Sequence, residues 1–301
     1  ACGHCSHLKL LIDLHTHTNC SDGTDSPAEL IAKAATLGLR AIAITDHDTL
    51  AGYFAAVDPA RAAAVELVCG IEISTRLDDQ KPVHLVAYFL DGPPPAAFQS
   101  GIDEIQQRRR ERNRKLATRL RELDLEIDLE EAEAIGRTVT GRLHFAQLLR
   151  DKGYVADLNE AFTRYIGEDA PAYVPMEEPD LLEMIGRVRD AGGVPVLAHP
   201  VRLAIHNPLD EEHTIRRLVD EGLLGLEVYH CDHRPTSTLR YLGLARKFGL
   251  SVTGGSDYHG AVKPHIELGS GWRGNVRLPS AILQGLRSRY QNLRPIRRAT
   301  A

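Results

Sequence analysis

The stretch LKLLIDLHTHTNCSDG, residues 8–23, contains a short apolar run that ends on two alternating histidines. Alternate residues of a β-strand project from the same face, so His15 and His17 would present two imidazoles in one direction. Two imidazoles placed in this way suit the chelation of a single metal ion. Taken alone, they are equally consistent with hydrogen bonding at the end of a strand.

Five further apolar runs end on, or just before, residue types that bind metals. Their nearly continuous apolarity is typical of strands buried on both faces. Helical patterns at 26–38, 180–192 and 236–249 separate several of them, which predicts a parallel sheet, open or closed. The active site of such a sheet lies at the carboxyl ends of its strands. The runs are LGLRAIAITDH (37–47), VELVCGIE (65–72), AGGVPVLAHP (191–200), EGLLGLEVYH (221–230) and FGLSVTGGSDYH (248–259).

The alternation of strands and helices breaks between residues 95 and 178. GPPPAAF (92–98) is typical of a turn, and a long polar helical pattern follows at 102–123. We therefore expect a discontinuous barrel domain formed by 8–95 and 179–290. Residues 96–178 would form a mostly helical insertion that caps the site.

Composition excludes several classes of protein. The 301 residues carry a formal net charge of −5 and are 43% hydrophobic, which is ordinary for a globular protein and unlike a general nucleic-acid coat. No run of 18 apolar residues and no secretory signal is visible. Five cysteines, an odd number at wide spacing, favour a reducing cytoplasm. We do not expect a native zinc site at the C-x-x-C of Cys2 and Cys5, because a seven-residue terminus would have to supply four ligands.

Taken together, five motifs in order resemble the polymerase-and-histidinol-phosphatase (PHP) superfamily. They are DLHTH (13–17), ITDHDT (44–49), GIEIS (70–74), VLAHP (196–200) and GSDYH (255–259). The resemblance runs from residue 10 to about residue 260. It implies an α/β fold, a distorted (β/α)7 barrel, with up to three metal ions.

The resemblance also implies a set of metal ligands. Mixed histidine and carboxylate ligands suit manganese, zinc or iron. We expect two or three divalent ions, manganese first, with zinc, ferrous iron and magnesium as alternatives. His84 lies in VHLVAYF, which is also consistent with an ordinary strand. The implied ligands are His15, His17, Glu72 and Asp257 for the first ion, Glu72, His84 and His199 for the second, and Asp22, His47 and His259 for the third.

Two ions bridged by a carboxylate would acidify a shared water, whose hydroxide could attack phosphorus. His230 and His233 are candidates for protonating the leaving oxygen, and the alternative is that both are ordinary loop histidines. Asp46 is a further catalytic candidate, and together with Asp13 it is expected to orient histidine ligands.

Two motifs in the expected insertion indicate the class of substrate. The segment Gly141–His144 is similar to a G-R-x-H segment of a PHP subgroup, and PAYVP (171–175) matches its aromatic before Val-Pro. This similarity implies that Arg142, His144 and Tyr173 bind substrate, with Arg142 on the phosphate that is not cleaved. The alternative for Arg142 is a helix cap or a surface ion pair. RRRERNRK (108–115) favours a solvated helix face with pairs such as Glu104–Arg108 and Glu111–Lys115.

The subgroup's chemistry gives the leading hypothesis. We expect a phosphatase that removes the 3′-phosphate from nucleoside 3′,5′-bisphosphates. The alternative is a 5′→3′ exonuclease on short RNA or DNA, and less favoured hypotheses are a non-catalytic metal-binding module and amide hydrolysis. The expected partner is a small nucleotide, with short oligonucleotides as the alternative substrate, and we expect no membrane and no stable protein partner.

Overall fold

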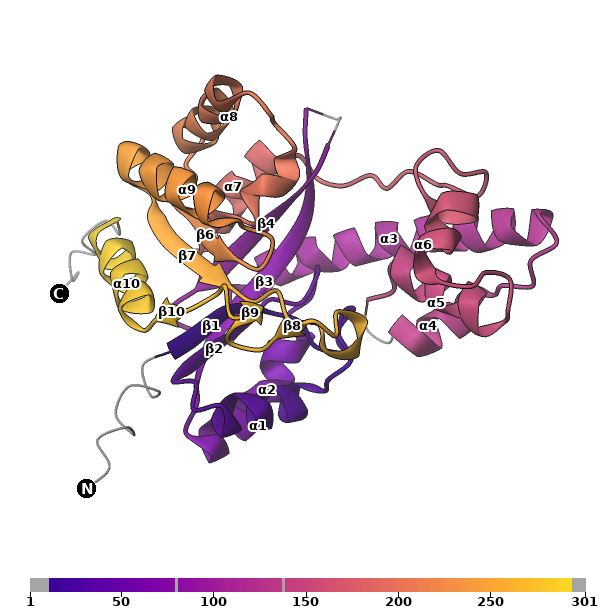
Figure 1. Cartoon of the computed structure of the whole chain (residues 1–301), viewed down its shortest axis with the longest axis horizontal. Coiled ribbons are helices and arrows are strands. Elements are labelled where there is room, and N and C mark those ends of the chain that lie inside the picture. Colours follow the sequence, from indigo (N-terminus) through magenta and orange to yellow (C-terminus); the bar gives the residue numbers. More distant parts are fainter. Residues whose placement is uncertain (1–10, 79–80, 137–138, 294–301) are drawn as a thin grey trace.

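The computed structural model describes residues 11–78, 81–136 and 139–293 (Figure 1). The C-x-x-C pattern of Cys2 and Cys5, and residues 8–10 of the expected barrel, lie outside the described residues. None of the described helices is long and apolar enough to cross a bilayer.

An eight-stranded sheet with the strand order β10-β1-β2-β3-β4-β5-β6-β7 forms the centre of the molecule. It confirms the predicted α/β fold built on a distorted seven-stranded barrel, to which the short β10 adds an antiparallel edge strand. A separate two-stranded ribbon is formed by β8 (Ile266–Glu267) and β9 (Gly271–Trp272). The sheet strands are β1 (Leu11–Thr16), β2 (Ala41–Ile44), β3 (Glu66–Leu77), β4 (Lys81–Phe89), β5 (Val194–Leu197), β6 (Gly225–His230), β7 (Ser251–Gly255) and β10 (Leu278–Pro279).

The expectation of a wholly parallel sheet is wrong at β4, which runs antiparallel to β3 and β5. Only residues 78–80 separate β3 from β4, too few for the crossover that parallel neighbours need. The hairpin also extends β3 beyond Glu72, which pairs with Val86 in the middle of the strand instead of ending it. Because β4 runs the opposite way, His84 near its start lies at the same edge as the carboxyl ends of the parallel strands.

The barrel is nearly closed where β7 meets β1. The amide of Asp257 donates to the carbonyl of His15, and the amide of His17 donates to the carbonyl of Tyr258, both at 2.9 Å. A Cβ at Gly255 would lie 2.3 Å from the backbone nitrogen of His15, so only glycine permits this approach. The closure brings the first and last metal-type motifs side by side.

Helices cover the outside of the barrel. Helix α1 begins at Pro27 with a capping box, in which the Ser26 hydroxyl accepts from the Glu29 amide and the Glu29 carboxylate accepts from the Ser26 amide. The predicted helices at 26–38, 180–192 and 236–249 are all present as α1, α7 and α9. The barrel helices are α1 (Pro27–Thr36), α2 (Ala51–Ala63), α7 (Leu181–Asp190), α8 (Pro208–Asp220), α9 (Pro235–Phe248) and α10 (Ala281–Leu293).

Helices from the central part of the chain extend to one side of the sheet (Figure 1). Ile102 and Ile105, near the start of the long α3, pack in the same apolar cluster as β3–β5, whereas Leu116 and Leu120 pack in a second cluster with Phe145. Helix α3 therefore joins two cores. We retain the division into a barrel and an insertion at 96–178 as a proposal. The elements are α3 (Ala96–Glu122), α4 (Leu129–Gly136), α5 (Arg142–Asp151), α6 (Leu158–Ala161) and the π-helical turn η2 (Phe162–Ile166).

Candidate metal centre

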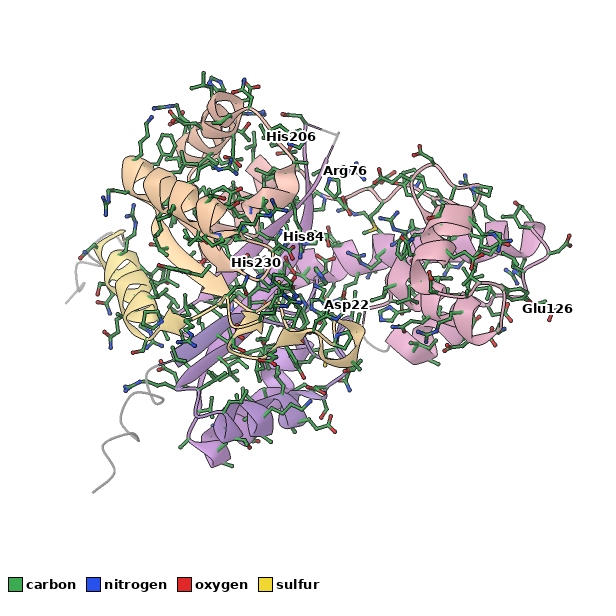
Figure 2. The ribbon with its side chains drawn as sticks, in the orientation of Figure 1. Asp22, Arg76, His84, Glu126, His206 and His230 are labelled. Carbon is green, nitrogen blue, oxygen red and sulfur yellow. The ribbon has the colours of Figure 1, made fainter. Side chains whose placement is uncertain are left out.

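The carboxylate of Glu72 is the meeting point of the implied ligands. Glu72 is 1% exposed in the middle of β3. Its Oε1 lies 2.9 Å from Nδ1 of His84 and 2.8 Å from Nε2 of His199. These are the three residues implied for the second ion. Figure 2 shows Asp22, His84 and His230 lying together towards the middle of the molecule.

The other oxygen of Glu72 faces the first group of ligands. Its Oε2 lies 3.2 Å from Nε2 of His15 and 3.2 Å from Nε2 of His17. Oδ1 of Asp257 lies 3.7 Å and 3.4 Å from the same two nitrogens. One carboxylate oxygen therefore faces each of the two ligand groups, which is the arrangement expected of a bridging carboxylate.

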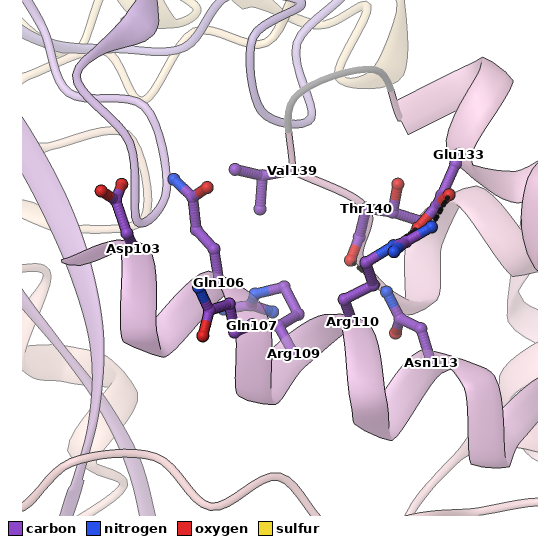
Figure 3. Close-up of a pocket in the computed structure, with 9 residues that line it drawn as sticks. All are labelled: Asp103, Gln106, Gln107, Arg109, Arg110, Asn113, Glu133, Val139 and Thr140. Carbon is purple, nitrogen blue, oxygen red and sulfur yellow. Dashed lines mark hydrogen bonds and ion pairs between the residues drawn. The ribbon is translucent and has the colours of Figure 1, made fainter. Parts of the chain in front are cut away.

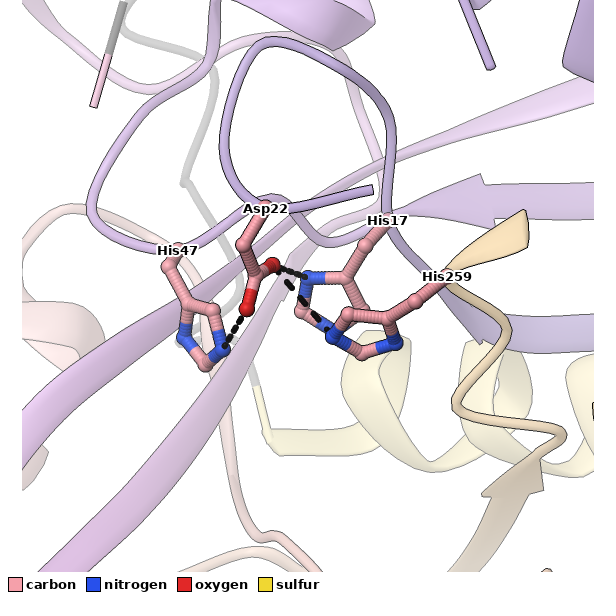
Figure 4. Close-up of side chains that lie close together, drawn as sticks. All are labelled: His17, Asp22, His47 and His259. Atoms are coloured by element: carbon pink, nitrogen blue, oxygen red, sulfur yellow. Dashed lines mark ion pairs between the residues drawn. The ribbon is translucent and has the colours of Figure 1, made fainter. Parts of the chain in front are cut away.

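Asp22 lies at the centre of a third group (Figure 4). Its Oδ1 lies 3.6 Å from Nδ1 of His17 and 3.3 Å from Nε2 of His259, and its Oδ2 lies 3.8 Å from Nε2 of His47. His17 thus has one ring nitrogen towards Glu72 and the other towards Asp22. Nδ1 of His47 lies 3.4 Å from Oε2 of Glu72, so this ring also lies between two groups.

The donor set fits divalent metal ions. Nε2 of His15, both ring nitrogens of His17 and Nδ1 of His47 are buried without a hydrogen-bond partner among the described residues. Buried polar atoms are normally satisfied, so unpaired nitrogens converging on carboxylates indicate a site for a cation. In the groups of the first and third ions, the ligand atoms lie within 4.8 Å of one another.

Other side chains fix the orientation of these rings. Glu227 accepts from Nδ1 of His15 at 2.8 Å and from the amide of His199 at 2.7 Å. Nδ1 of His259 donates to the carbonyl of Asp257 at 2.8 Å, which leaves Nε2 free for a metal. Glu227 lies within one of the apolar runs, which ends on His230, but its role as an orienting group was not predicted.

Asp13 and Asp46, expected to orient histidine ligands, bond to the segments that carry ligands, and neither forms a hydrogen bond to a ligand ring of the described residues. Oδ1 of Asp46 accepts from the amide of Thr18 and from the hydroxyl of Ser21, both at 2.7 Å, and thereby holds the loop that carries Asp22. Asp13 accepts from the amide of Ser256 at 2.9 Å, next to Asp257. Both carboxylates are fully buried.

In the protein without bound ions, burial and nearby charges leave some of the site's histidines protonated at pH 7 and others neutral. Burial disfavours the charged ring of His17, but the nearby carboxylates of Asp257 and Glu72 outweigh it and raise the pKa to about 9. Burial lowers the pKa of His47 and that of His199 to about 3. The latter two rings are therefore neutral at pH 7 and available as ligands.

The two predicted proton donors differ in position. Nε2 of His230 lies 3.4 Å from Oδ2 of Asp257, and Nδ1 accepts from the amide of Asp232 at 3.1 Å. His233 lies farther from the cluster, because its Nδ1 donates to the carbonyl of Val228 at 2.8 Å and its ring lies against Tyr241. His230 alone of the two faces a candidate metal ligand.

The three predicted substrate residues lie on the insertion. The guanidinium of Arg142 lies over the ring of Tyr173, with 5.4 Å from its carbon to the ring centroid. Nδ1 of His144 accepts from the amide of Gly141 at 2.9 Å and so caps the start of α5. Burial lowers the pKa of His144 against the attraction of the Asp22 carboxylate, which indicates that this ring lies towards the third ligand group.

Two further arginines of α3 join this region and were not singled out in the sequence. Arg109 donates to Ser74 at 2.9 Å and pairs with Asp48, which follows His47 directly. Arg112 is 6% exposed, and its Nε has no partner among the described residues. Burial and repulsion from Arg109 and Arg142 lower the pKa of Arg112 to about 9, against the attraction of the Glu178 carboxylate. The charges of two further arginines therefore act on this buried guanidinium.

The exposed arginines of α3 form ion pairs, as the sequence favoured. Arg108 lies 3.8 Å from Glu104, the pair expected at i,i+4. Arg110 pairs with Glu133 at 2.6 Å. Two other expectations for this helix are wrong. Glu111 pairs with Arg114 and not with Lys115, and Arg112 is buried and does not lie on the solvated face.

Known proteins resemble the chain over most of its length. The PHP domain family model matches residues 13–135. The chain is 32% identical over 276 residues to the 5′-3′ exoribonuclease Rnm of Escherichia coli, covering 88% of this chain and 90% of that protein. It is 31% identical over 258 residues to the 3′,5′-nucleoside bisphosphate phosphatase of Chromobacterium violaceum, covering 82% and 87%.

A solved structure has the same fold. An amidohydrolase from Chromobacterium violaceum with bound sulfate matches at a TM-score of 0.78 and 28% identity, over 92% of this chain and 96% of that one. The names of the two sequence relatives both denote hydrolysis of phosphoesters. Sequence similarity, fold and buried ligand groups agree, and the chain therefore belongs to the PHP domain family and is a metal-dependent phosphoesterase.

Proposed function

We propose that this phosphoesterase removes the 3′-phosphate from nucleoside 3′,5′-bisphosphates and releases the 5′-nucleotide. The observation that carries the proposal is the buried Arg112, which lies beside Arg109 and Arg142 without an ion pair to a described residue. A buried cation needs an anion, and repulsion between neighbouring guanidiniums increases that need. The substrate's second phosphate would meet it, since guanidiniums bind phosphate oxygens through paired hydrogen bonds.

The surroundings of Arg109 support a substrate of nucleotide size. A cavity of about 350 Å³ lies along α3 and is bordered by Gln106, Arg109, Asn113 and Thr140 (Figure 3). Its volume falls within the usual range for small-molecule sites. The amide groups on its wall suit the polar edges of a nucleoside.

The chain's residues have distinct proposed roles in the reaction. Bound divalent ions, manganese in our proposal, supply Lewis-acid stabilisation and an acidified water. The nine implied ligands hold them, Glu227 keeps His15 in the ligating tautomer, and Asp46 holds the loop of Asp22. His230 is our candidate for contact with the leaving oxygen: Nδ1 accepts a backbone hydrogen bond, so Nε2 carries the proton of the neutral ring and can donate a hydrogen bond to that oxygen.

The test is phosphate release from adenosine 3′,5′-bisphosphate by protein reloaded with manganese. We expect this substrate to be preferred to 3′-AMP, which lacks the second phosphate. Arg112→Gln should raise KM for the bisphosphate at least tenfold and change KM for 3′-AMP little, whereas Arg114→Gln, which removes an exposed pair with Glu111 outside the cavity, should change neither. Lack of hydrolysis of the bisphosphate, alongside rapid hydrolysis of another phosphoester, would refute the proposal.

Similarity to the exoribonuclease supports a second candidate, 5′→3′ cleavage of short RNA from a phosphorylated end. The same arginines would then bind the terminal 5′-phosphate, but a longer groove would need free cations along α3. Reversing Arg108 and Arg114 to Glu should weaken oligonucleotide cleavage far more than bisphosphate hydrolysis if such a groove exists, because neither residue borders the cavity. Equal small effects on both substrates would favour the mononucleotide.

A further inference from the structure

Two cations share one oxygen of a candidate metal ligand. Asp257 is 1% exposed, and its Oδ1 faces the first ligand group. Its Oδ2 accepts from Nη2 of Arg202 at 2.9 Å and from Nζ of Lys263 at 2.8 Å. Asp232 also pairs with Arg202, at 2.7 Å, so two carboxylates face the two cations. A metal ion on Asp257 would take up part of that charge and leave the pair with cationic capacity to spare.

Both cations come from segments that follow ligand-bearing strands. Arg202 lies on the turn η3 (Pro200–Leu203), three residues after His199, and its amide donates to the carbonyl of His199 at 2.9 Å. Lys263 follows the turn η4 (Gly260–Val262), four residues after His259. Both therefore lie at the edge of the barrel where the metal ligands gather.

Unlike the buried Asp257, these two side chains are accessible. The side chain of Arg202 is 39% exposed and that of Lys263 is 32% exposed. Arg202 also borders a cavity of about 180 Å³ together with His84 and His199. Its Nε donates to Asp232 at 2.8 Å, while Nη1 has no hydrogen bond with a described residue. The guanidinium of Arg202 can therefore donate further hydrogen bonds, through Nη1, beside the candidate metal ligands His84 and His199.

We infer that Arg202 and Lys263 form a clamp for the phosphoryl group that is cleaved, distinct from the arginines proposed for the second phosphate. In the protein without ions or substrate, both cations rest on Asp257. When Asp257 shares its charge with a bound ion, the clamp is free to contact the phosphoryl oxygens, on which negative charge must be stabilised. Arg202 supplies a planar fork and Lys263 a compact charge.

The inference rests on phosphoester hydrolysis at the metal centre and not on the identity of the nucleotide. Its test therefore uses a generic aryl phosphate as substrate and inorganic phosphate as competing ligand. Arg202→Gln and Lys263→Gln should each lower kcat/KM by about 10²–10³-fold, the usual cost of one such donor. Inorganic phosphate should compete at least tenfold more weakly, and Arg202→Lys should recover part of both losses.

The amount of manganese that the variants bind distinguishes a phosphate clamp from residues that only position the metal ligand Asp257. The variants should bind as much manganese as the unaltered protein, and Arg217→Gln, which removes an exposed pair with Asp78, should change nothing. Loss of manganese in parallel with activity, or unchanged competition by phosphate, would overturn the clamp. If Arg202→Gln does not fold, Lys263→Gln gives the same readouts. Normal aryl phosphate hydrolysis without bisphosphate hydrolysis would refute only the proposed function.

Discussion

The site depends on a few carboxylates that each serve two partners. Glu72 directs one oxygen to each of two ligand groups. Glu227 binds the ring of His15 through one oxygen and the backbone of His199 through the other, so a single side chain fixes ligands from β1 and from the segment after β5. Such orienting partners usually contribute strongly to metal affinity.

Glu227→Gln should therefore weaken metal binding by about 10–100-fold, the usual effect of removing an orienting carboxylate. The amide nitrogen of glutamine would face the His199 amide, and two donors cannot pair. Titration calorimetry with manganese measures the change. Glu212→Gln, which removes an exposed pair with Lys247, is the matched control. Unchanged affinity in Glu227→Gln would show that His15 is held by other contacts.

Metal affinity should rise with pH. In the ion-free protein His17 has its pKa raised to about 9, so it carries a proton at pH 7, and a metal must displace that proton. Affinity should increase as pH rises towards about 9 and level off above it, with protons released on binding at pH 7. Calorimetry in buffers of different ionisation enthalpy measures the release. Pure uptake, or no exchange, would contradict the assigned state of His17.

At the scale of elements, the strand ends were the most predictable feature. Asp46, His199 and Asp257 lie where the sequence expects them because parallel strands bring their carboxyl ends to one edge. The hairpin β3–β4 was not predicted, since apolar continuity does not distinguish strand direction. The burial of Arg112 was also missed, because an arginine-rich helix does not reveal from its pattern which cation faces a core.

The exposed and buried faces of α3 should respond differently to mutation. Arg108 and Arg114 form surface pairs, which contribute only about 0–1 kcal/mol each. The double substitution Arg108→Gln and Arg114→Gln should leave bisphosphate kcat/KM within about twofold and the unfolding temperature nearly unchanged. Steady-state kinetics and calorimetry test this. A large loss of activity would indicate that the exposed face binds substrate.

On the scale of the whole molecule, ligands and substrate groups come from different parts of the chain. All nine implied metal ligands lie outside 96–178, whereas Arg109, Arg112 and Arg142 lie within it. The helical segments have their own apolar cluster, which includes Leu116, Leu120 and Leu149. We therefore expect metal binding and the second-phosphate site to be separable by mutation.

Leu149→Ala tests this separation. Leu149 is fully buried, so truncation should lower the free energy of unfolding by about 2–5 kcal/mol. The cavity would form in the helical cluster, so manganese stoichiometry should stay unchanged while KM for the bisphosphate rises. Denaturant unfolding and metal analysis measure both quantities. Loss of bound manganese at temperatures where the variant is folded would argue that the two cores are not separable.

The most direct test of the account is a crystal structure with manganese and a slowly hydrolysed nucleoside 3′,5′-bisphosphate analogue, with anomalous scattering locating the ions. We predict at least two ions bridged by Glu72, the 3′-phosphate beside them and the 5′-phosphate on Arg112 and Arg142. Ions bound away from Glu72, or a 5′-phosphate that contacts neither arginine, would contradict it.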